Sequence, residues 1–257
     1  MPTLTIYNAV HELPALPPHS QSGGGFVFAI ARGGSSLMNS ALRLLTNKES
    51  PVAYMNLPGH FYEQGITLDN LDAESLATLQ AYLGTSGIIF GGWRARPRFA
   101  LPIRPDTKTF LLVRDPRDVL TSLYYYQVHV SKKLNAETTI DDFVRKAAAH
   151  YHAMFSAYND LQLTSDLKLC RYEDIVFDKP ALLRALSEHF SIGAPKHKIE
   201  RIAALVDKQA PEEAPGSHVR QVRPGDHLRK LKPKTIAELS EVFQDVLRRY
   251  GYSAALV

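Results

Sequence analysis

A chain of 257 residues, with 45% hydrophobic and 22% charged residues, is long enough for one large globular domain or two small ones. The formal net charge is only +4 and the basic residues are not gathered in one block, which argues against a nucleic-acid partner. The single cysteine excludes an internal disulfide, and no run of about 20 apolar residues predicts a membrane span. Because no signal peptide is recognisable either, we expect a cytoplasmic protein with no membrane partner.

The predicted elements alternate between strands and helices. Residues 1–24 are expected to be an irregular lead-in, because prolines and a glycine triplet interrupt them. Short apolar runs predict strands at 26–31, 52–55, 87–90, 109–113 and 167–171. Apolar residues at helical spacing predict helices at 36–46, 71–83, from 116 onward, 140–161, 179–190, and from 233 to a stop at Gly251.

The segments between these elements are expected to lack regular structure. They are a loop at 56–70 and a polar, proline-punctuated stretch at 191–232. Strands that alternate with helices imply an α/β fold, a three-layer sandwich in which right-handed crossovers build a central parallel sheet. With no internal repeat in the chain, we expect a single domain over residues 1–257.

The stretch from Phe26 to Leu45 predicts an anion-binding turn. An apolar strand leads into Arg32-Gly33-Gly34-Ser35-Ser36, here called the anion loop, and a helix follows. Paired glycines let backbone N–H groups converge on an anion, and the helix N-terminus adds partial positive charge. The arginine and the serine hydroxyls supply further donors. An ordinary strand–turn–helix with a capping serine explains the same residues equally well, so the rest of the chain has to decide.

A second pattern pairs an arginine with a serine. Arg114 directly follows an apolar strand, and Ser122 stands eight residues later in a helix expected to begin near Pro116. Ligands gather at the carboxyl ends of parallel strands, and two helical turns span about seven residues, so both side chains can face one pocket. A solvated run of charges at a helix start explains Asp115, Arg117 and Asp118 more simply.

The two patterns together resemble the sulfotransferases that use 3′-phosphoadenosine 5′-phosphosulfate (PAPS). In that family, a strand–loop–helix near the N-terminus binds the 5′-phosphosulfate, and an arginine–serine pair of this spacing binds the 3′-phosphate. The resemblance implies a P-loop NTPase-like sulfotransferase fold, with residues 32–37 (RGGSSL, ending at Leu37) and the pair Arg114 and Ser122 in the cofactor site. Arg32 stands where many cytosolic members have lysine.

Two later stretches agree with this resemblance. The segment after the 167–171 strand is similar to the family's R-Y-E-D segment, which implies that Tyr172 lies near the adenine. Residues 220–226 are similar to the R-K-G-x-x-G-D loop, which implies cofactor contacts from Arg220 and Gln221. This loop departs from the family pattern, because Gln221 and Val222 replace lysine and glycine and His227 stands where tryptophan is usual.

The resemblance implies in-line transfer of a sulfuryl group from PAPS to a hydroxyl or amine of a small-molecule acceptor, with adenosine 3′,5′-bisphosphate (PAP) as product. Arg32 would stabilise the leaving group. No metal is expected, because no carboxylate cluster stands near the anion loop. Many members carry their general base in a T-H-x-P segment, but the matching residues 91–97 contain no histidine.

Other residues must therefore supply the base. His60 and Glu63 follow the second strand at the sheet end of the anion loop and are the preferred candidates, although surface positions explain both more simply. Trp93, Tyr125 and His129 are candidates for the acceptor pocket, with a place in the core as the simpler explanation of the tyrosine run.

Two other functions stay open. A small-molecule or nucleotide kinase would use a similar loop, but the Walker lysine is missing and a kinase needs Mg²⁺. A non-catalytic nucleotide-binding protein would bind PAP without transfer. The arginines at 94, 96 and 98 are explained by an acidic acceptor or, more simply, by a solvated basic loop. A homodimer is compatible with the sequence.

Overall fold

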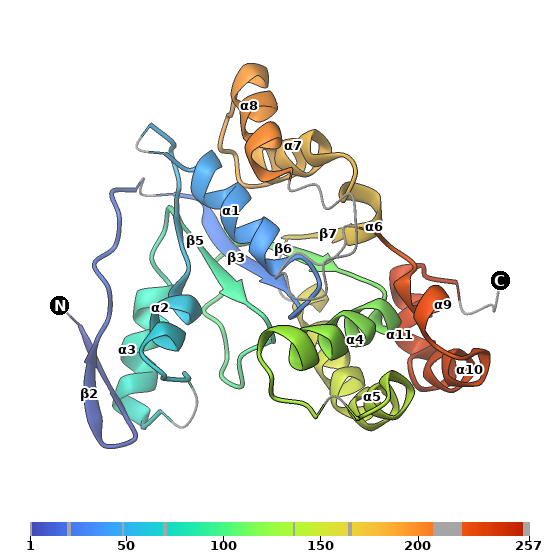
Figure 1. The fold of residues 1–257 in the computed structure, drawn as a ribbon. Helices are drawn as coiled ribbons and strands as arrows, with labels where there is room; N and C mark the ends of the chain where they lie inside the picture. The colour runs from blue at the N-terminus through green and yellow to red at the C-terminus, as the bar shows by residue number, and fades with distance from the viewer. Residues whose placement is uncertain are drawn as a thin grey trace.

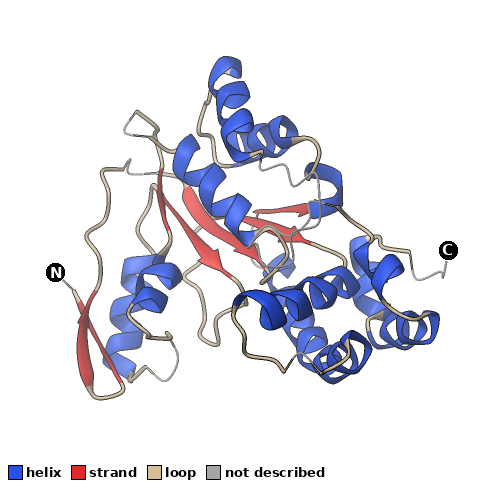
Figure 2. Cartoon of the chain, in the orientation of Figure 1, coloured by secondary structure: helices blue, strands red, loops and turns tan. Residues whose placement is uncertain are grey.

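The computed structural model describes residues 2–19, 22–47, 49–68, 71–135, 137–163, 166–207 and 223–253. Its centre is a parallel sheet in the order β4-β5-β3-β6-β7 (Figure 1). These strands are β3 (Gly24–Ala29), β4 (Ala53–Met55), β5 (Ile88–Trp93), β6 (Lys108–Val113) and β7 (Asp166–Arg171). Helices cover both faces of this sheet (Figure 2), which confirms the predicted three-layer α/β fold.

The helices form one layer on each face of the sheet (Figure 1). One layer contains α1 (Ser35–Leu45), α6 (Tyr172–Ile175), α7 (Lys179–His189) and α8 (Lys196–Val206). The other contains α2 (Leu57–Glu63), α3 (Ala73–Leu83), α4 (Pro116–Tyr125), α5 (Ile140–Ser156), α10 (Pro233–Val242) and α11 (Gln244–Tyr250). The described residues also form three further short helices: a π-helix (Tyr126–Val130), a 3₁₀ helix (Ala157–Leu163) and α9 (Asp226–Lys230).

Strand β3 is buried on both faces of the sheet. Phe26 and Phe28 pack into the hydrophobic core under α2–α5, whereas Val27 and Ala29 pack into the core under α1, α7 and α8. Because neighbouring side chains of a strand point to opposite faces, a strand between two helical layers has to be apolar throughout. This explains the continuous apolar run in the sequence.

The strand order places β3 beside β6, and their carboxyl ends meet. From β3 the chain continues to β4 at one edge of the sheet, whereas from β6 it continues to β7 at the other edge. Such a reversal opens a crevice outside the carboxyl ends of the two strands, where ligands of open α/β sheets bind. Both predicted anion-binding patterns follow these two strands.

The N-terminal lead-in is not irregular throughout. Residues Thr3–Ile6 (β1) and Ala9–Glu12 (β2) pair as an antiparallel hairpin. Tyr7 and Asn8 between them have φ values of 51° and 62°, as a tight two-residue hairpin turn requires. The signal was the alternation in Thr-Leu-Thr-Ile, whose apolar residues are buried.

Three other expectations also need correction. The 56–70 loop contains α2, whose first turn is capped by the Asn56 side chain, an acceptor for Gly59 N at 3.0 Å. The polar stretch at 191–232 contains α8 and α9, and the 3–4 spacing of apolar residues in α8 was its signal. The single helix expected from 233 is two helices, because the backbone leaves helical geometry at Phe243 (φ −97°, ψ 15°).

Within the described ranges, no helix is both long and apolar enough to cross a bilayer. The expected compartment stays a prediction.

Candidate functional site

The anion loop connects β3 to α1 through a tight turn. Gly33 N donates to Ile30 O at 2.8 Å, and Arg32 and Gly34 have φ values of 67° and 103°. A Cβ atom added at Gly34 would lie 2.9 Å from Leu112 Cδ2, so no larger residue fits without a shift. The turn leads directly into the first turn of α1, where backbone N–H groups lack intrahelical acceptors. This backbone can therefore donate to an anion.

The loop arginine meets the predicted arginine–serine pair. Arg32 Nε donates to Ser122 Oγ on α4 at 3.3 Å, and Arg114 Nη1 donates to the Arg32 carbonyl oxygen at 3.3 Å. The Arg32 guanidinium also lies 4.7 Å from the centre of the Tyr126 ring. Burial lowers the pKa of Arg32, and the positive charge of Arg114 lowers it further. The structure thus brings together Arg32, Arg114 and Ser122 from the two sequence patterns.

Arg114 is buried at the end of β6, with 6% of its surface exposed. Its guanidinium lies 4.7 Å from the centre of the Tyr172 ring on α6 and 3.5 Å from Asp118 Oδ2. Burial favours a lower pKa for Arg114, but Asp118, Tyr172 and Glu173 together outweigh it and the pKa is raised. Arg114 Nε has no hydrogen-bond acceptor in the part of the chain that the structure describes. A buried, charged side chain with an unused donor fits an anionic ligand.

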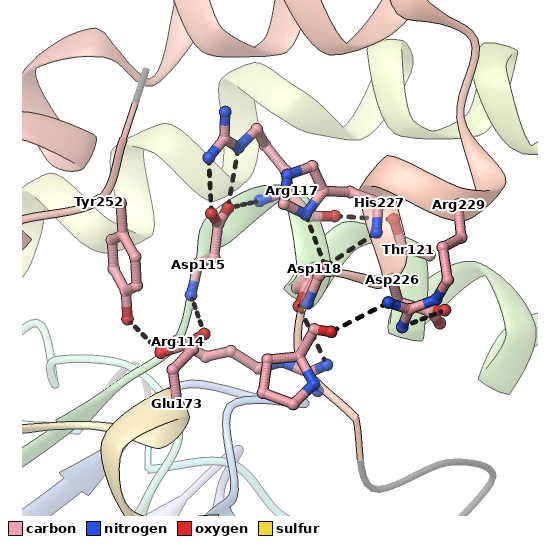
Figure 3. Close-up of polar contacts among 12 residues, drawn as sticks. Arg114, Asp115, Arg117, Asp118, Thr121, Glu173, Asp226, His227, Arg229 and Tyr252 are labelled. Atoms are coloured by element: carbon pink, nitrogen blue, oxygen red, sulfur yellow. Dashed lines mark hydrogen bonds and ion pairs between the residues drawn. The ribbon is translucent and has the colours of Figure 1, made fainter. Parts of the chain in front are cut away.

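Asp118 joins Arg114 to the residues that follow segment 208–222 (Figure 3). Its buried carboxylate accepts from Gly225 N at 2.7 Å and from His227 N and Nδ1 at 2.9 and 2.7 Å. Burial favours a higher pKa for Asp118, but the hydrogen bond from His227 and the charge of Arg114 hold it well below its usual range. An ionised carboxylate only accepts, so His227 Nδ1 carries the hydrogen between them. The predicted residues Arg220 and Gln221 lie outside the described residues.

A second set of polar contacts holds the start of α4 (Figure 3). Arg117 donates to the Asp115 carboxylate at 2.7 and 3.0 Å, and both side chains are buried. Asp115 N donates to Glu173 Oε1 at 3.0 Å, and Tyr252 Oη donates to Glu173 Oε2 at 2.8 Å. The interpretation of Asp115, Arg117 and Asp118 as solvated charges is therefore wrong. They are buried polar groups that fix the turn after Arg114.

A cavity of about 310 Å³, here called the α7 cavity, lies between α1 and α6–α8. Its lining residues are Gly34, Ser36, Leu37, Ser40, Arg43, Leu44, Tyr172, Val176, Lys179, Leu205 and Val206. Gly34, Ser36 and Leu37 come from the first predicted motif and Tyr172 from the third. Motifs more than a hundred residues apart in the sequence thus share one cavity.

A second cavity of about 250 Å³, here called the α2 cavity, lies beside α2 and the residues that follow β5. Apolar side chains of its wall are Pro58, Phe61, Ile66, Leu68, Trp93 and Phe99. Its polar side chains include Asn39, Asn56, Arg94 and Arg96. Because Asn39 lines this cavity while Ser36 and Ser40 line the α7 cavity, the first turns of α1 contribute to both.

The candidates for the base and the acceptor pocket lie on α2, on β5, on α4 and on the π-helix that follows α4. His60 is on α2, with Nε2 at 3.0 Å from Gln64 Nε2, and Glu63 is exposed at the end of the same helix. Tyr125 and His129 stack with ring centres 5.9 Å apart. None of the four is among the residues that line either cavity, whereas Trp93 lines the α2 cavity. Among the described residues, no group of three or more His, Cys, Asp or Glu side chains is arranged to hold a metal ion.

Comparison with protein families matches residues 95–251 to the sulfotransferase domain. The structure is similar to that of mouse sulfotransferase SULT7A1 complexed with PAP, with a TM-score of 0.63 and 12% identity over 91% of this chain and 86% of that chain. It is also similar to retinol dehydratase in complex with androsterone and the inactive cofactor PAP, with a TM-score of 0.59 and 16% identity over 90% and 82% of the two chains. At these identities the likeness concerns the fold. No match was found among curated protein sequences.

Proposed function

This chain belongs to the sulfotransferase domain family, and we propose that its PAPS-dependent sulfuryl transfer acts on a hydroxyl or amine of a small-molecule acceptor. The two solved structures named above contain PAP, and one of them also contains androsterone. The observation that best supports the cofactor site is the convergence of Arg32, Arg114 and Ser122 at the crevice between β3 and β6. The kinase alternative is not favoured.

We assign the two cavities to the two substrates. The nucleotide would occupy the α7 cavity, with Tyr172 and Leu37 near the adenosine, and the acceptor would occupy the α2 cavity. Helix α1 contributes to both, so the anion loop at its N-terminus stands between donor and acceptor. This is where the transferred group has to pass.

The residues that would hold PAPS fit a nucleotide with two separate anionic groups. Arg114, with its unused Nε, and Ser122 would bind the 3′-phosphate, and the backbone of the anion loop would bind the 5′-phosphosulfate. PAPS supplies the sulfuryl group, and its bond from sulfur to the phosphate oxygen breaks as the acceptor oxygen or nitrogen attacks in line. Arg32 would stabilise the negative charge left on the phosphate. Arg220 and Gln221 stay predicted cofactor contacts.

The acceptor has to lose a proton as it attacks. His60 on α2 is our proposed base, with Glu63 as the second candidate, because α2 forms part of the wall beside the acceptor. Trp93 would pack against the acceptor from inside the α2 cavity. Tyr125 and His129 remain candidates for the acceptor side.

Transfer from PAPS to a panel of phenols, alcohols and amines tests this proposal. We expect a sulfated product and a PAP product in equal amounts. His60→Ala should lower kcat about 100-fold, because general-base catalysis contributes at least that factor. His150→Ala, which changes an exposed histidine on α5, should leave kcat unchanged. Unchanged turnover in His60→Ala would remove His60 as the base, and PAP binding without transfer to any acceptor would favour the non-catalytic alternative.

A further inference from the structure

The charged side chains that line the α2 cavity are positive. Two arginines and no acidic side chain are among the described residues that line it. Arg96 is already paired, with Nη1 at 2.5 Å from Asp160 Oδ2. Arg94 has no carboxylate partner among the described residues, and its guanidinium lies 6.0 Å from the centre of the Tyr62 ring. The cavity therefore offers one arginine whose charge is not balanced by an ion pair.

Much of the rest of the wall is apolar, and four of its side chains are aromatic. Trp93 and Phe99 meet edge to face with ring centres 6.3 Å apart, and Phe61 of α2 is also part of the wall. A flat apolar molecule fits such a wall, because aromatic rings pack favourably in edge-to-face and offset arrangements. About 250 Å³ accommodates a single substituted ring.

Arg94 is exposed at the carboxyl end of β5, the same edge of the sheet at which the anion loop follows β3. It directly follows β5, and its positive charge is one of the causes that lower the pKa of Arg32. Arg94 lines the α2 cavity, whereas Arg32 lies outside that lining, in the anion loop. Since Arg32 belongs to the anion loop, Arg94 is the arginine left for the acceptor itself.

We propose that the acceptor is a small aromatic alcohol or phenol that carries a carboxylate, and that Arg94 determines this specificity by binding the carboxylate. The inference rests on the proposed function, because it names the substrate class of the same site. A guanidinium binds a carboxylate through two parallel N–H···O bonds, a geometry that a neutral ring substituent does not offer. The phenolic or alcoholic oxygen would point toward the anion loop.

A pair of acceptors that differ only in charge tests the inference. The probes are 4-hydroxyphenylacetate and its neutral analogue 4-hydroxyphenylacetamide, each titrated calorimetrically into the PAP-saturated protein and each assayed for sulfation. We expect the carboxylate to bind about tenfold more tightly than the amide, as a charge-assisted pair implies. Arg94→Gln should remove that preference, because it should weaken the binding of the carboxylate probe and not that of the amide. Arg98→Gln, which changes an exposed arginine of the same loop that does not line the cavity, should leave it intact.

Two outcomes would overturn the inference. One is a protein that binds PAP but binds the two probes equally well, or binds neither of them. The other is an Arg94→Gln variant that loses kcat equally on both probes at unchanged affinity, which would place Arg94 on the transferred group instead. Failure of PAP itself to bind would instead refute the proposed cofactor site, so the two failures are distinguishable.

Discussion

Replacing Arg114 with glutamine is expected to weaken PAP binding about 150-fold, because the 3′-phosphate loses a charge-assisted contact worth about 3 kcal/mol. AMP has no 3′-phosphate, so the affinity of the variant for AMP should stay within about threefold of the affinity of the unsubstituted protein for AMP. Both affinities are measured by isothermal titration calorimetry. The ratio of the two affinities is the quantity that decides, because a general loss of structure would weaken both ligands.

A second variant keeps the Arg114 test decisive if Arg114→Gln folds poorly. Ser122 on α4 is a partner of Arg32, and Ser122→Ala removes a neutral donor. We expect about a fivefold loss of PAP affinity, the size of one neutral hydrogen bond. Equal losses for PAP and AMP in either variant would contradict the assignment of Arg114 and Ser122 to the 3′-phosphate.

Replacing Asp118 with asparagine is expected to lower the free energy of unfolding by about 4 kcal/mol, because it leaves the buried Arg114 without a counter-charge. The asparagine amide would also oppose N–H donors that now point at the carboxylate, from Gly225 and His227. Urea denaturation measures the change. PAP affinity should fall as well, since Asp118 orients Arg114 and holds the residues after segment 208–222.

An exposed ion pair provides the matched control. Asp160 pairs with Arg96 at the surface, and Asp160→Asn should cost no more than about 1 kcal/mol.

Asp118 also predicts a pH dependence of the stability. Its folded-state pKa lies below the unfolded value of about 3.9, so its contribution is complete above that pH and disappears as the pH falls toward the folded-state pKa. The difference in unfolding free energy between the unsubstituted protein and Asp118→Asn should therefore shrink at low pH. A difference that persists unchanged at the lowest pH would contradict this role.

The sequence predicted the parts of the site that local patterns encode. Glycines beside Arg32 predicted a tight turn before a helix, and Gly34 in the structure has a φ of 103° directly before α1. Arg114 was placed correctly because a charged residue directly after a buried strand stands at the carboxyl edge of the sheet. Helix geometry then predicted that Ser122, eight residues later and about two turns into α4, faces the same site.

The partners of buried charges could not be predicted in the same way. Asp118 and His227 are 109 positions apart, and nothing in either local pattern indicates that they meet. The charges around Pro116 resemble a solvated helix start, because a sequence shows which residues are charged but not which are covered. Their burial depends on contacts with α9 and α10, through His227 and Ser240, which form only when the chain folds. The α1 contribution to two cavities is likewise visible only in three dimensions.

The most direct test of the cofactor assignment is a thermal-shift titration of the unsubstituted protein with PAP, AMP and ATP, with and without EDTA. A ligand that binds only the folded state raises the melting temperature by mass action, by the equivalent of about 2.7 kcal/mol at a hundred times its Kd. We expect PAP to stabilise the protein far more than AMP or ATP does, and EDTA to have no effect. Stabilisation by ATP that requires Mg²⁺, with none by PAP, would contradict a PAPS site at the crevice between β3 and β6.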